Sequence, residues 1–394
     1  MNALSQLLNL PEAEKAKRGL AHTPAEIAQQ PATWGATFEL FSSKRKEIRN
    51  FLSAAGTTSP GDSQVIVFLV GAGTSDYIGQ AVSQLLRKSW RCEVIAVPST
   101  DLLTQMDELI LPGRKYLWIS FSRSGDSSEG VAVMARALER YPEIHHIVIS
   151  CNPNGRMLRE NVGNPKVLGI CLNDAVNDRG LAMTSSFSNM VIFGQCLAHT
   201  DNLEAYEPVL QRLVTAAKSF LPRAADCAAG LAKQGFKKAF FVGSGPLRAT
   251  AKESALKVLE LTAGKTLTMT ESALGLRHGP MAALDSQSLF VCFLSGDKRV
   301  QEYERDLLRE IGTKKLAQCR VVVGGSELVA DSYAEHYVVP ATGAGVGDEY
   351  RAPVDVMFGQ LLGLFSSIRW NLMPDSPSPD GVISRVVQNV SIHS

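Results

Sequence analysis

Short runs of apolar, mostly β-branched residues alternate along the chain with longer stretches of mixed polarity. Such short apolar runs are typical of strands buried on both faces of a parallel sheet, and the longer stretches are typical of crossover helices between strands. The expected strands form two series: Gln64–Val70, Glu93–Val97, Tyr116–Phe121, His146–Ser150 and Val167–Leu172, followed by Ala239–Val242, Leu267–Thr270, Leu289–Leu294, Arg320–Val323 and Tyr337–Val339.

The two series also share sequence. Val67-Phe-Leu-Val-Gly-Ala-Gly73 resembles Ala239-Phe-Phe-Val-Gly-Ser-Gly245, and Ser124-Gly-Asp126 recurs as Ser295-Gly-Asp297. The two offsets, 172 and 171 residues, agree, and a chance likeness of two strand–glycine turns would not be expected to keep its register. We therefore predict an α/β protein with two tandem domains, each a parallel sheet with crossover helices.

The predicted organisation has four parts: an N-terminal helical arm at 1–45, a first domain at 46–205, a second at 206–373 and a tail at 374–394. In the arm, Thr23-Pro-Ala-Glu26 is the pattern of a capping box with proline at the first helical position. Pro374, Pro377, Pro379 and Gly381 end the long apolar helix that precedes them, and the tail that follows can cover a site.

Composition narrows the function classes. The chain of 394 residues is 45% hydrophobic, and its 40 Lys and Arg residues nearly balance 39 Asp and Glu, which disfavours nucleic acid as a partner. Because no signal-like N-terminus and no unbroken apolar span is present, we expect a cytoplasmic protein without membrane segments. The seven cysteines lack metal-ligand spacing, and His145 and His146 point to opposite sides of a strand, so we expect reduced thiols and no metal site.

Two loops have the composition of phosphate cradles. Gly71-Ala-Gly-Thr-Ser75 follows a buried strand and precedes a helix that we expect to begin near Asp76. Ser120-Phe-Ser-Arg-Ser-Gly-Asp-Ser-Ser128 follows another strand and adds three more hydroxyl groups. Capped turns without a ligand are the alternative, but two such loops favour one phosphomonoester. The longer fingerprints of dinucleotide and triphosphate loops are missing.

The second series of strands carries different chemistry. Pro246 and Leu247 replace a donor N–H and a hydroxyl of the first loop, so much of the cradle is lost there. On the helix Arg248–Leu261, Lys257 and Glu260 share one face with Glu253, where the alternative is a solvated ladder of ion pairs. His278 precedes Gly-Pro and is expected on a loop, where a structural histidine is the alternative to a catalytic one.

Several of these motifs together resemble the sugar isomerase (SIS) domain family and, over nearly the whole chain, its galactosamine-6-phosphate deaminases, which have also been described as tagatose-6-phosphate ketose/aldose isomerases. The resemblance depends on Gly71–Ser75, Ser120–Asp126, Ala255–Glu260, Leu276–Pro280 and Arg385–Val390. The same motifs are similar to the isomerase half of glucosamine-6-phosphate synthase. The resemblance implies two tandem, doubly wound SIS domains of flavodoxin-like parallel-sheet topology, an acid–base sugar-phosphate enzyme and no cofactor.

The resemblance also implies roles for individual residues. Ser75, Ser122, Ser124 and Ser127 would bind the phosphate, with Thr74 beside them. Glu260 would move a proton between C1 and C2, Lys257 matches the lysine one turn before that glutamate, and His278 would open the sugar ring from the neighbouring subunit of a homodimer. Four further residues are expected near the substrate: Gly73, Arg123, Thr184 and Gln388.

Two departures from the synthase bear on the reaction. No glutamine amidotransferase domain is present, so glutamine is not the expected nitrogen source, and Gln388 stands where the synthase has a lysine able to form a Schiff base. An amino sugar would bring its own nitrogen. We therefore expect deamination and isomerisation of galactosamine 6-phosphate to tagatose 6-phosphate and ammonia. A tagatose-6-phosphate ketose/aldose isomerase is the second hypothesis, and a non-catalytic sugar-phosphate sensor is the third.

Overall fold

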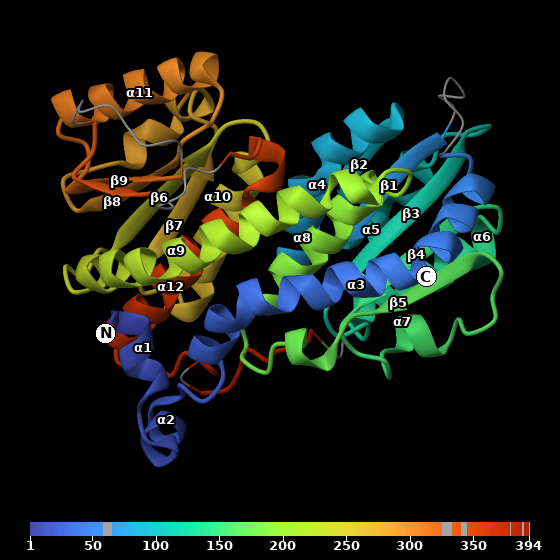
Figure 1. Cartoon of the computed structure of the whole chain (residues 1–394), viewed down its shortest axis with the longest axis horizontal. Helices are drawn as coiled ribbons and strands as arrows, with labels where there is room; N and C mark the ends of the chain where they lie inside the picture. The colour runs from blue at the N-terminus through green and yellow to red at the C-terminus, as the bar shows by residue number, and fades with distance from the viewer. Residues whose placement is uncertain (58–64, 325–332, 340–344, 379, 388–389, 394) are drawn as a thin grey trace. The chain divides into compact units, whose positions relative to one another are not determined.

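The computed structural model describes residues 1–57, 65–324, 333–339, 345–378, 380–387 and 390–393. Contacts divide the chain into two compact units, each built on one parallel sheet (Figure 1). We call them the first-sheet unit, which comprises Thr33–Asn177, Ser185–Glu207 and Ser384–Ser394, and the second-sheet unit, which comprises Met1–Ala32, Asp178–Thr184 and Pro208–Ile383.

The first sheet consists of β1 (Val65–Gly71), β2 (Glu93–Pro98), β3 (Lys115–Ser122), β4 (His145–Ser150) and β5 (Val167–Cys171). All pairings are parallel, in the order β2-β1-β3-β4-β5. Every residue of β1 is buried, which explains its continuous apolar sequence. The helices of this unit are α4 (Thr74–Trp90), α5 (Ser99–Leu109), α6 (Ser128–Arg140), α7 (Arg156–Arg159) and α8 (Ser185–Ala198).

The second sheet consists of β6 (Lys238–Gly243), β7 (Leu267–Glu271), β8 (Ser288–Phe293), β9 (Cys319–Val323) and β10 (His336–Val338). Its strands are also parallel, in the order β10-β9-β8-β6-β7. Its main helices are α9 (Glu207–Ala232), α10 (Leu247–Leu261), α11 (Lys298–Thr313) and α12 (Ala352–Arg369).

The two sheets have the same topology. Taken from β7, the second sheet repeats the order of the first, with the second strand of each series at one edge, the first strand next to it, and the third, fourth and fifth strands following. Each predicted strand is present, with ends displaced by no more than one residue. The predicted fold class of two doubly wound parallel sheets is therefore confirmed.

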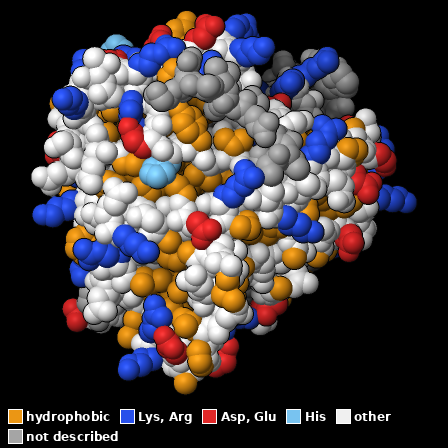
Figure 2. Space-filling model, turned by 60° about the vertical axis from the view of Figure 1, so that its left-hand side comes forward, with side chains coloured by type: hydrophobic (Ala, Val, Ile, Leu, Met, Phe, Trp, Pro, Cys, Tyr) orange, Lys and Arg blue, Asp and Glu red, His pale blue; other side chains and the backbone are white. Residues whose placement is uncertain are grey.

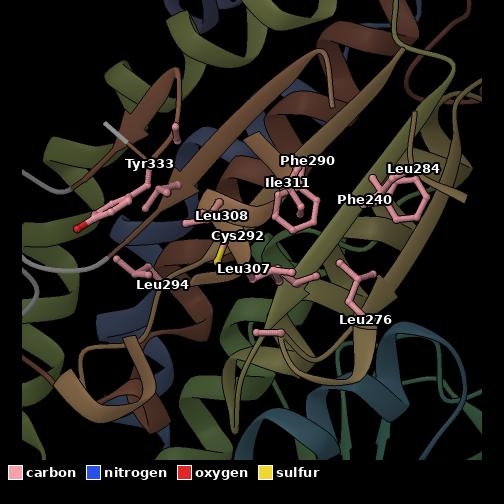
Figure 3. Close-up of a cluster of buried hydrophobic side chains, with 14 residues drawn as sticks. Phe240, Leu276, Leu284, Phe290, Cys292, Leu294, Leu307, Leu308, Ile311 and Tyr333 are labelled. Atoms are coloured by element: carbon pink, nitrogen blue, oxygen red, sulfur yellow. The ribbon is translucent and has the colours of Figure 1, made fainter. Parts of the chain in front are cut away.

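One face of the second sheet is covered by α11. Leu307, Leu308 and Ile311 of that helix pack with Phe240 of β6 and Phe290 of β8 (Figure 3). All five side chains are almost fully buried. This layer anchors the strands whose carboxyl ends lead into the loops after β6 and β8. Helix α10, which is not part of this cluster, packs against β6, β7 and β8.

The N-terminal region is helical, as expected, and consists of α1 (Ala3–Leu8), α2 (Glu12–Arg18) and α3 (Thr23–Ala55). The predicted capping box at the start of α3 is wrong. The N–H and the hydroxyl of Thr23 each donate to Asp375 Oδ1 at 2.7 Å, and the Glu26 carboxylate accepts the backbone N–H groups of Arg179 and Gly180. A distant carboxylate therefore caps this helix in place of the local glutamate.

The surface carries mixed charge. On the face shown in Figure 2, Lys and Arg side chains are interspersed with Asp and Glu, in line with a formal net charge of +1. No helix among the described residues combines the length and apolar character needed to span a bilayer.

Candidate active site

The first predicted phosphate loop joins β1 to α4. The helix begins at Thr74, two residues earlier than predicted, so Thr74 and Ser75 form its first turn and are both buried. Gly73, with φ of +56°, is the N-cap. A Cβ at Gly71 would lie 2.3 Å from the carbonyl carbon of Ser75, so only glycine allows the turn to close this tightly. The loop thus places two hydroxyl side chains at a helix N-terminus, a position that favours anions.

The second predicted phosphate loop joins β3 to α6. The Ser122 and Ser124 hydroxyls accept the backbone N–H groups of Gly125 and Asp126 at 3.1 and 3.2 Å. Ser127 is the N-cap of α6, and its side chain makes no capping hydrogen bond. Because β1 and β3 are neighbours, both loops lie at the carboxyl edge of the first sheet. Hydroxyls and helix N-termini at one edge provide donors for a phosphate group.

Arg123, a predicted substrate residue, contacts the C-terminal tail in this structure. Its guanidinium donates to the carbonyl of Arg385 at 2.6 Å, and Arg385 donates to Asn177 Oδ1 at 2.7 Å. The N–H of Ser128 donates to the carbonyl of Val387 at 3.4 Å. The tail therefore lies against the second phosphate loop within the first-sheet unit. Gln388 lies outside the described residues.

Thr184, another predicted substrate residue, belongs to the second-sheet unit and is fully buried. Its N–H and hydroxyl donate to the carboxylate of Asp178 at 2.8 and 3.1 Å. Nearby, burial and, to a smaller extent, the charge of Asp178 together raise the pKa of Glu26 to about 7. Thr184 thus orders the segment 178–184, and its side chain is already hydrogen-bonded.

In the second copy of the repeat, the chain's own carboxylates use the donors of the loop after β8. The N–H of Ser295 donates to Glu304 Oε2, and the N–H of Gly296 donates to Asp348 Oδ1, both at 2.8 Å. The hydroxyl of Ser295 also donates to Asp348, at 2.5 Å. Pro246, in the loop after β6, has no N–H to offer. The sequence predicts a weakened cradle in this copy. In the structure, the donors of the loop after β8 are already bound by Glu304 and Asp348.

A buried charge cluster of the second-sheet unit lies on α10. The ammonium of Lys257 forms ion pairs with Glu253, at 3.2 Å, and with Glu260. The side chains of Lys257 and Glu253 are 1% and 0% exposed, whereas that of Glu260 is 22% exposed. The alternative of a solvated ladder of ion pairs is therefore wrong. Only Glu260 of the three can meet a substrate without rearrangement.

The charge of Lys257 is maintained by its neighbours. Burial alone would lower the pKa of this ammonium, but the carboxylates of Glu253 and Glu260 raise it above its ordinary value. Lys257 therefore stays protonated beside Glu260. Glu253 lies one helical turn before Lys257 in the sequence, but it was not among the predicted site residues. Its i, i+4 spacing from Lys257 was the available signal, but the spacing carries no information about burial.

His278 follows the 3₁₀ turn Gly275–Arg277 and is exposed, as expected for a loop residue. No hydrogen bond from its side chain is found among the described residues. His278 and the α10 cluster belong to the second-sheet unit, whereas the two serine and threonine loops belong to the first. Within the described parts of the chain, no group of three or more His, Cys, Asp or Glu side chains is placed to hold a metal ion.

Comparison with solved structures defines the class of the protein. A Clostridium novyi protein, named as a candidate tagatose-6-phosphate ketose/aldose isomerase, is 27% identical with a TM-score of 0.92, covering 100% of this chain and 99% of that one. The Escherichia coli tagatose-6-phosphate ketose/aldose isomerase is 29% identical with a TM-score of 0.82, over 94% and 96% of the two chains. The C-terminal domain of glucosamine-fructose-6-phosphate aminotransferase from Francisella tularensis shares the fold, with a TM-score of 0.73 and 16% identity over 88% of this chain and 96% of that one. The fold is therefore of the SIS type.

Sequence relatives define the family more closely. No protein-family model matches the sequence. A candidate D-galactosamine-6-phosphate deaminase AgaS from Streptomyces coelicolor is 38% identical over 375 residues, 95% of each chain. The D-galactosamine-6-phosphate deaminase AgaS of Escherichia coli is 32% identical over 376 residues, 94% of this chain and 95% of the relative. The chain belongs to the AgaS family of D-galactosamine-6-phosphate deaminases.

Proposed function

We propose that the protein converts D-galactosamine 6-phosphate and water to D-tagatose 6-phosphate and ammonia. The observation that carries this proposal is the group on α10, in which a buried, protonated Lys257 lies beside the partly exposed carboxylate of Glu260. A partly exposed carboxylate beside a buried positive charge is suited to take a proton from carbon. Similarity to AgaS deaminases over nearly the full length supports this substrate.

Phosphate binding is assigned to the two loops of the first sheet. Thr74, Ser75, Ser122, Ser124 and Ser127 supply hydroxyl groups, and the first turns of α4 and α6 supply backbone N–H groups. A phosphate held at one end of the sugar determines where C1 and C2 lie, so binding energy from the phosphate orients the reacting carbons.

The proton transfers follow from this orientation. His278 moves a proton from O1 to the ring oxygen, which opens the sugar to its aldehyde. Glu260 then removes the proton at C2, the electron pair forms a C1–C2 double bond, and O1 is protonated. Return of the proton to C1 leaves an iminium group at C2, and its nitrogen releases a proton that balances the one taken up by O1. Water hydrolyses the resulting imine to the ketose and ammonia. C1 is reduced while C2 is oxidised, so the balance requires no external redox partner.

The exposed His278 supports a site shared between subunits. Its side chain has no hydrogen-bond partner among the described residues, which leaves it available to a second copy of the chain. We therefore include a homodimer in the proposal. All seven cysteines are unpaired, which suits a reducing compartment, and we propose that the enzyme acts in the cytoplasm.

A ketose/aldose isomerase acting on tagatose 6-phosphate is the second candidate function. It is favoured by the names of the two structural neighbours with TM-scores of 0.92 and 0.82. The same base could serve both reactions, because each moves a proton between C1 and C2. Release of ammonia separates the two.

The test uses the purified wild-type protein and Glu260→Gln, which keeps the size of the side chain and removes the base. Wild type should release ammonia from galactosamine 6-phosphate, and the variant should lose about 10²–10⁴-fold in kcat with little change in KM. Interconversion of phosphorylated ketose and aldose without ammonia from the amino sugar would favour the isomerase. Full activity of Glu260→Gln would refute the assignment of the base.

A further inference from the structure

Helix α12 meets the backbone of α10 through two glycines, Gly359 and Gly363, which lie one turn apart on the same side of the helix. A Cβ at Gly363 would lie 2.8 Å from the carbonyl oxygen of Lys257 and 3.1 Å from its carbonyl carbon. A Cβ at Gly359 would lie 2.3 Å from the Cβ of Ser254 and 2.6 Å from its Cα. The two helices therefore approach each other closely, with α12 against the backbone carbonyl of Lys257 and the side chain of Leu261 at one point and against the Cα and side chain of Ser254 at the other.

The contact points lie at the residues of the charged cluster on α10. Gly363 faces the backbone carbonyl of Lys257, and Gly359 faces Ser254, the neighbour of Glu253. The side chain of Glu260 begins one helical turn beyond Lys257. The depth at which α12 packs therefore sets where the ammonium and the base lie.

Helix α12 has little freedom to retreat from α10. Its residues from Ala352 to Ser367 are buried at every position. The side chain of Gln360, between the two glycines, accepts a hydrogen bond from Gln30 at 2.7 Å, and Arg351 at the N-cap pairs with Asp355 at 2.6 Å. Added bulk at the glycines would therefore be accommodated by α10, at the end where Glu260 reaches the surface.

We propose that Gly359 and Gly363 are positioning residues, which hold Lys257 and Glu260 at the depth that proton transfer requires. The inference rests on the proposed function, because it takes Glu260 as the base. It extends that function to a second helix, whose glycines touch neither substrate nor base.

The test compares Gly363→Ala with Gly230→Ala. Gly230 lies in α9, and a Cβ there would have no neighbour within 4 Å, so it controls for the change of glycine to alanine in a helix. In Gly363→Ala, kcat should fall by about 10- to 100-fold, KM should change by less than about twofold, and the acid limb of the pH profile of kcat should move as the ammonium shifts from the base. Gly230→Ala should match wild type in all three.

The possible outcomes separate this inference from the proposed function. If Glu260→Gln is inactive but Gly363→Ala keeps the kcat and pH profile of wild type, positioning is refuted and the base assignment stands. If Glu260→Gln is fully active, both fail. Should Gly363→Ala not fold, Gly359→Ala is measured in the same way. Failure of both variants to fold would overturn the inference, because the glycines would then serve the stability of the fold.

Discussion

At the scale of single residues, Lys257 shows how a charge is kept inside this protein. An ammonium without partners would lose its proton on full burial, but here two carboxylates flank it, and one of them is itself completely buried. Removal of Glu253 would take one of these two carboxylates from the ammonium. The buried glutamate is therefore part of the chemistry of the site, although it is too deep to touch a substrate directly.

Glu304 is a buried carboxyl group of a different kind. Its pKa is raised to about 7, against an ordinary value of 4.5, mainly by burial and to a smaller extent by the charge of Asp348, although the N–H of Ser295 donates a hydrogen bond that opposes the rise. Its Oε1 is buried and has no hydrogen-bond partner among the described residues. Between about pH 4.5 and about pH 7, the Glu304 carboxyl is therefore mostly protonated in the folded chain and mostly ionised in the unfolded chain.

This difference predicts a pH dependence of stability. A raised pKa in the folded state contributes stability below about pH 4.5, and the contribution is lost as the pH rises through about 7. Relative to Glu304→Gln, which cannot ionise, wild type should lose about 2 kcal/mol of unfolding free energy between about pH 5 and about pH 8. Glu26, also raised to about 7, is present in both proteins and cancels. Chemical denaturation across this range is the measurement, and parallel curves would contradict the assignment.

At the scale of elements, the duplication supplies a matched pair of strand-to-helix turns. A Cβ at Gly71 would lie 2.5 Å from the carbonyl oxygen of Ser75, and one at Gly243 would lie 2.4 Å from that of Leu247. Each glycine lets a helix begin directly after its strand. The first turn leads to the hydroxyls of α4, and the second leads to the charged cluster of α10.

Substitutions of these two glycines should therefore change different kinetic parameters. Gly71→Ala should raise KM for the sugar phosphate, because it displaces Thr74 and Ser75, with a smaller effect on kcat. Gly243→Ala should lower kcat with a smaller effect on KM, because it displaces the start of α10. Each substitution should also destabilise the protein by about 1–3 kcal/mol, since the clash is with backbone. Steady-state kinetics of the folded variants measure both kcat and KM. The same kinetic change in both would contradict this division of roles.

At the scale of the whole molecule, a shared site predicts complementation between inactive variants. Glu260→Gln and His278→Asn homodimers should both be nearly inactive. In a mixed dimer, one of the two sites combines an intact Glu260 with an intact His278, so an equimolar mixture after subunit exchange should recover about one quarter of wild-type activity. Ammonia release before and after mixing is the measurement. If the mixture stays inactive although exchange is demonstrated, each chain carries its own complete site.

The fold was predictable from the sequence because its signals are local. A buried parallel strand needs an unbroken apolar run, and a tight turn into a helix needs glycine, so both leave a mark within a few residues. The same holds for the serine and threonine loops, whose position after β1 and β3 follows from the strand pattern. The capping box was mispredicted because Asp375, 352 residues away from Thr23, supplies the cap. No local pattern can report such a partner.

By itself, the sequence determined the two parallel sheets, their duplication, and the residue types of the two serine and threonine loops and of the face of α10. Only the tertiary structure decided which charges on α10 are buried, that Glu253 belongs to the cluster, that Glu304 and Asp348 use the donors of the second cradle, and that α12 meets Lys257 through a glycine. Periodicity shows which side chains share a face of one element. Burial, and the pKa values that follow from it, depend on what packs against that face, and for α10 this includes α12, about a hundred residues further along the chain.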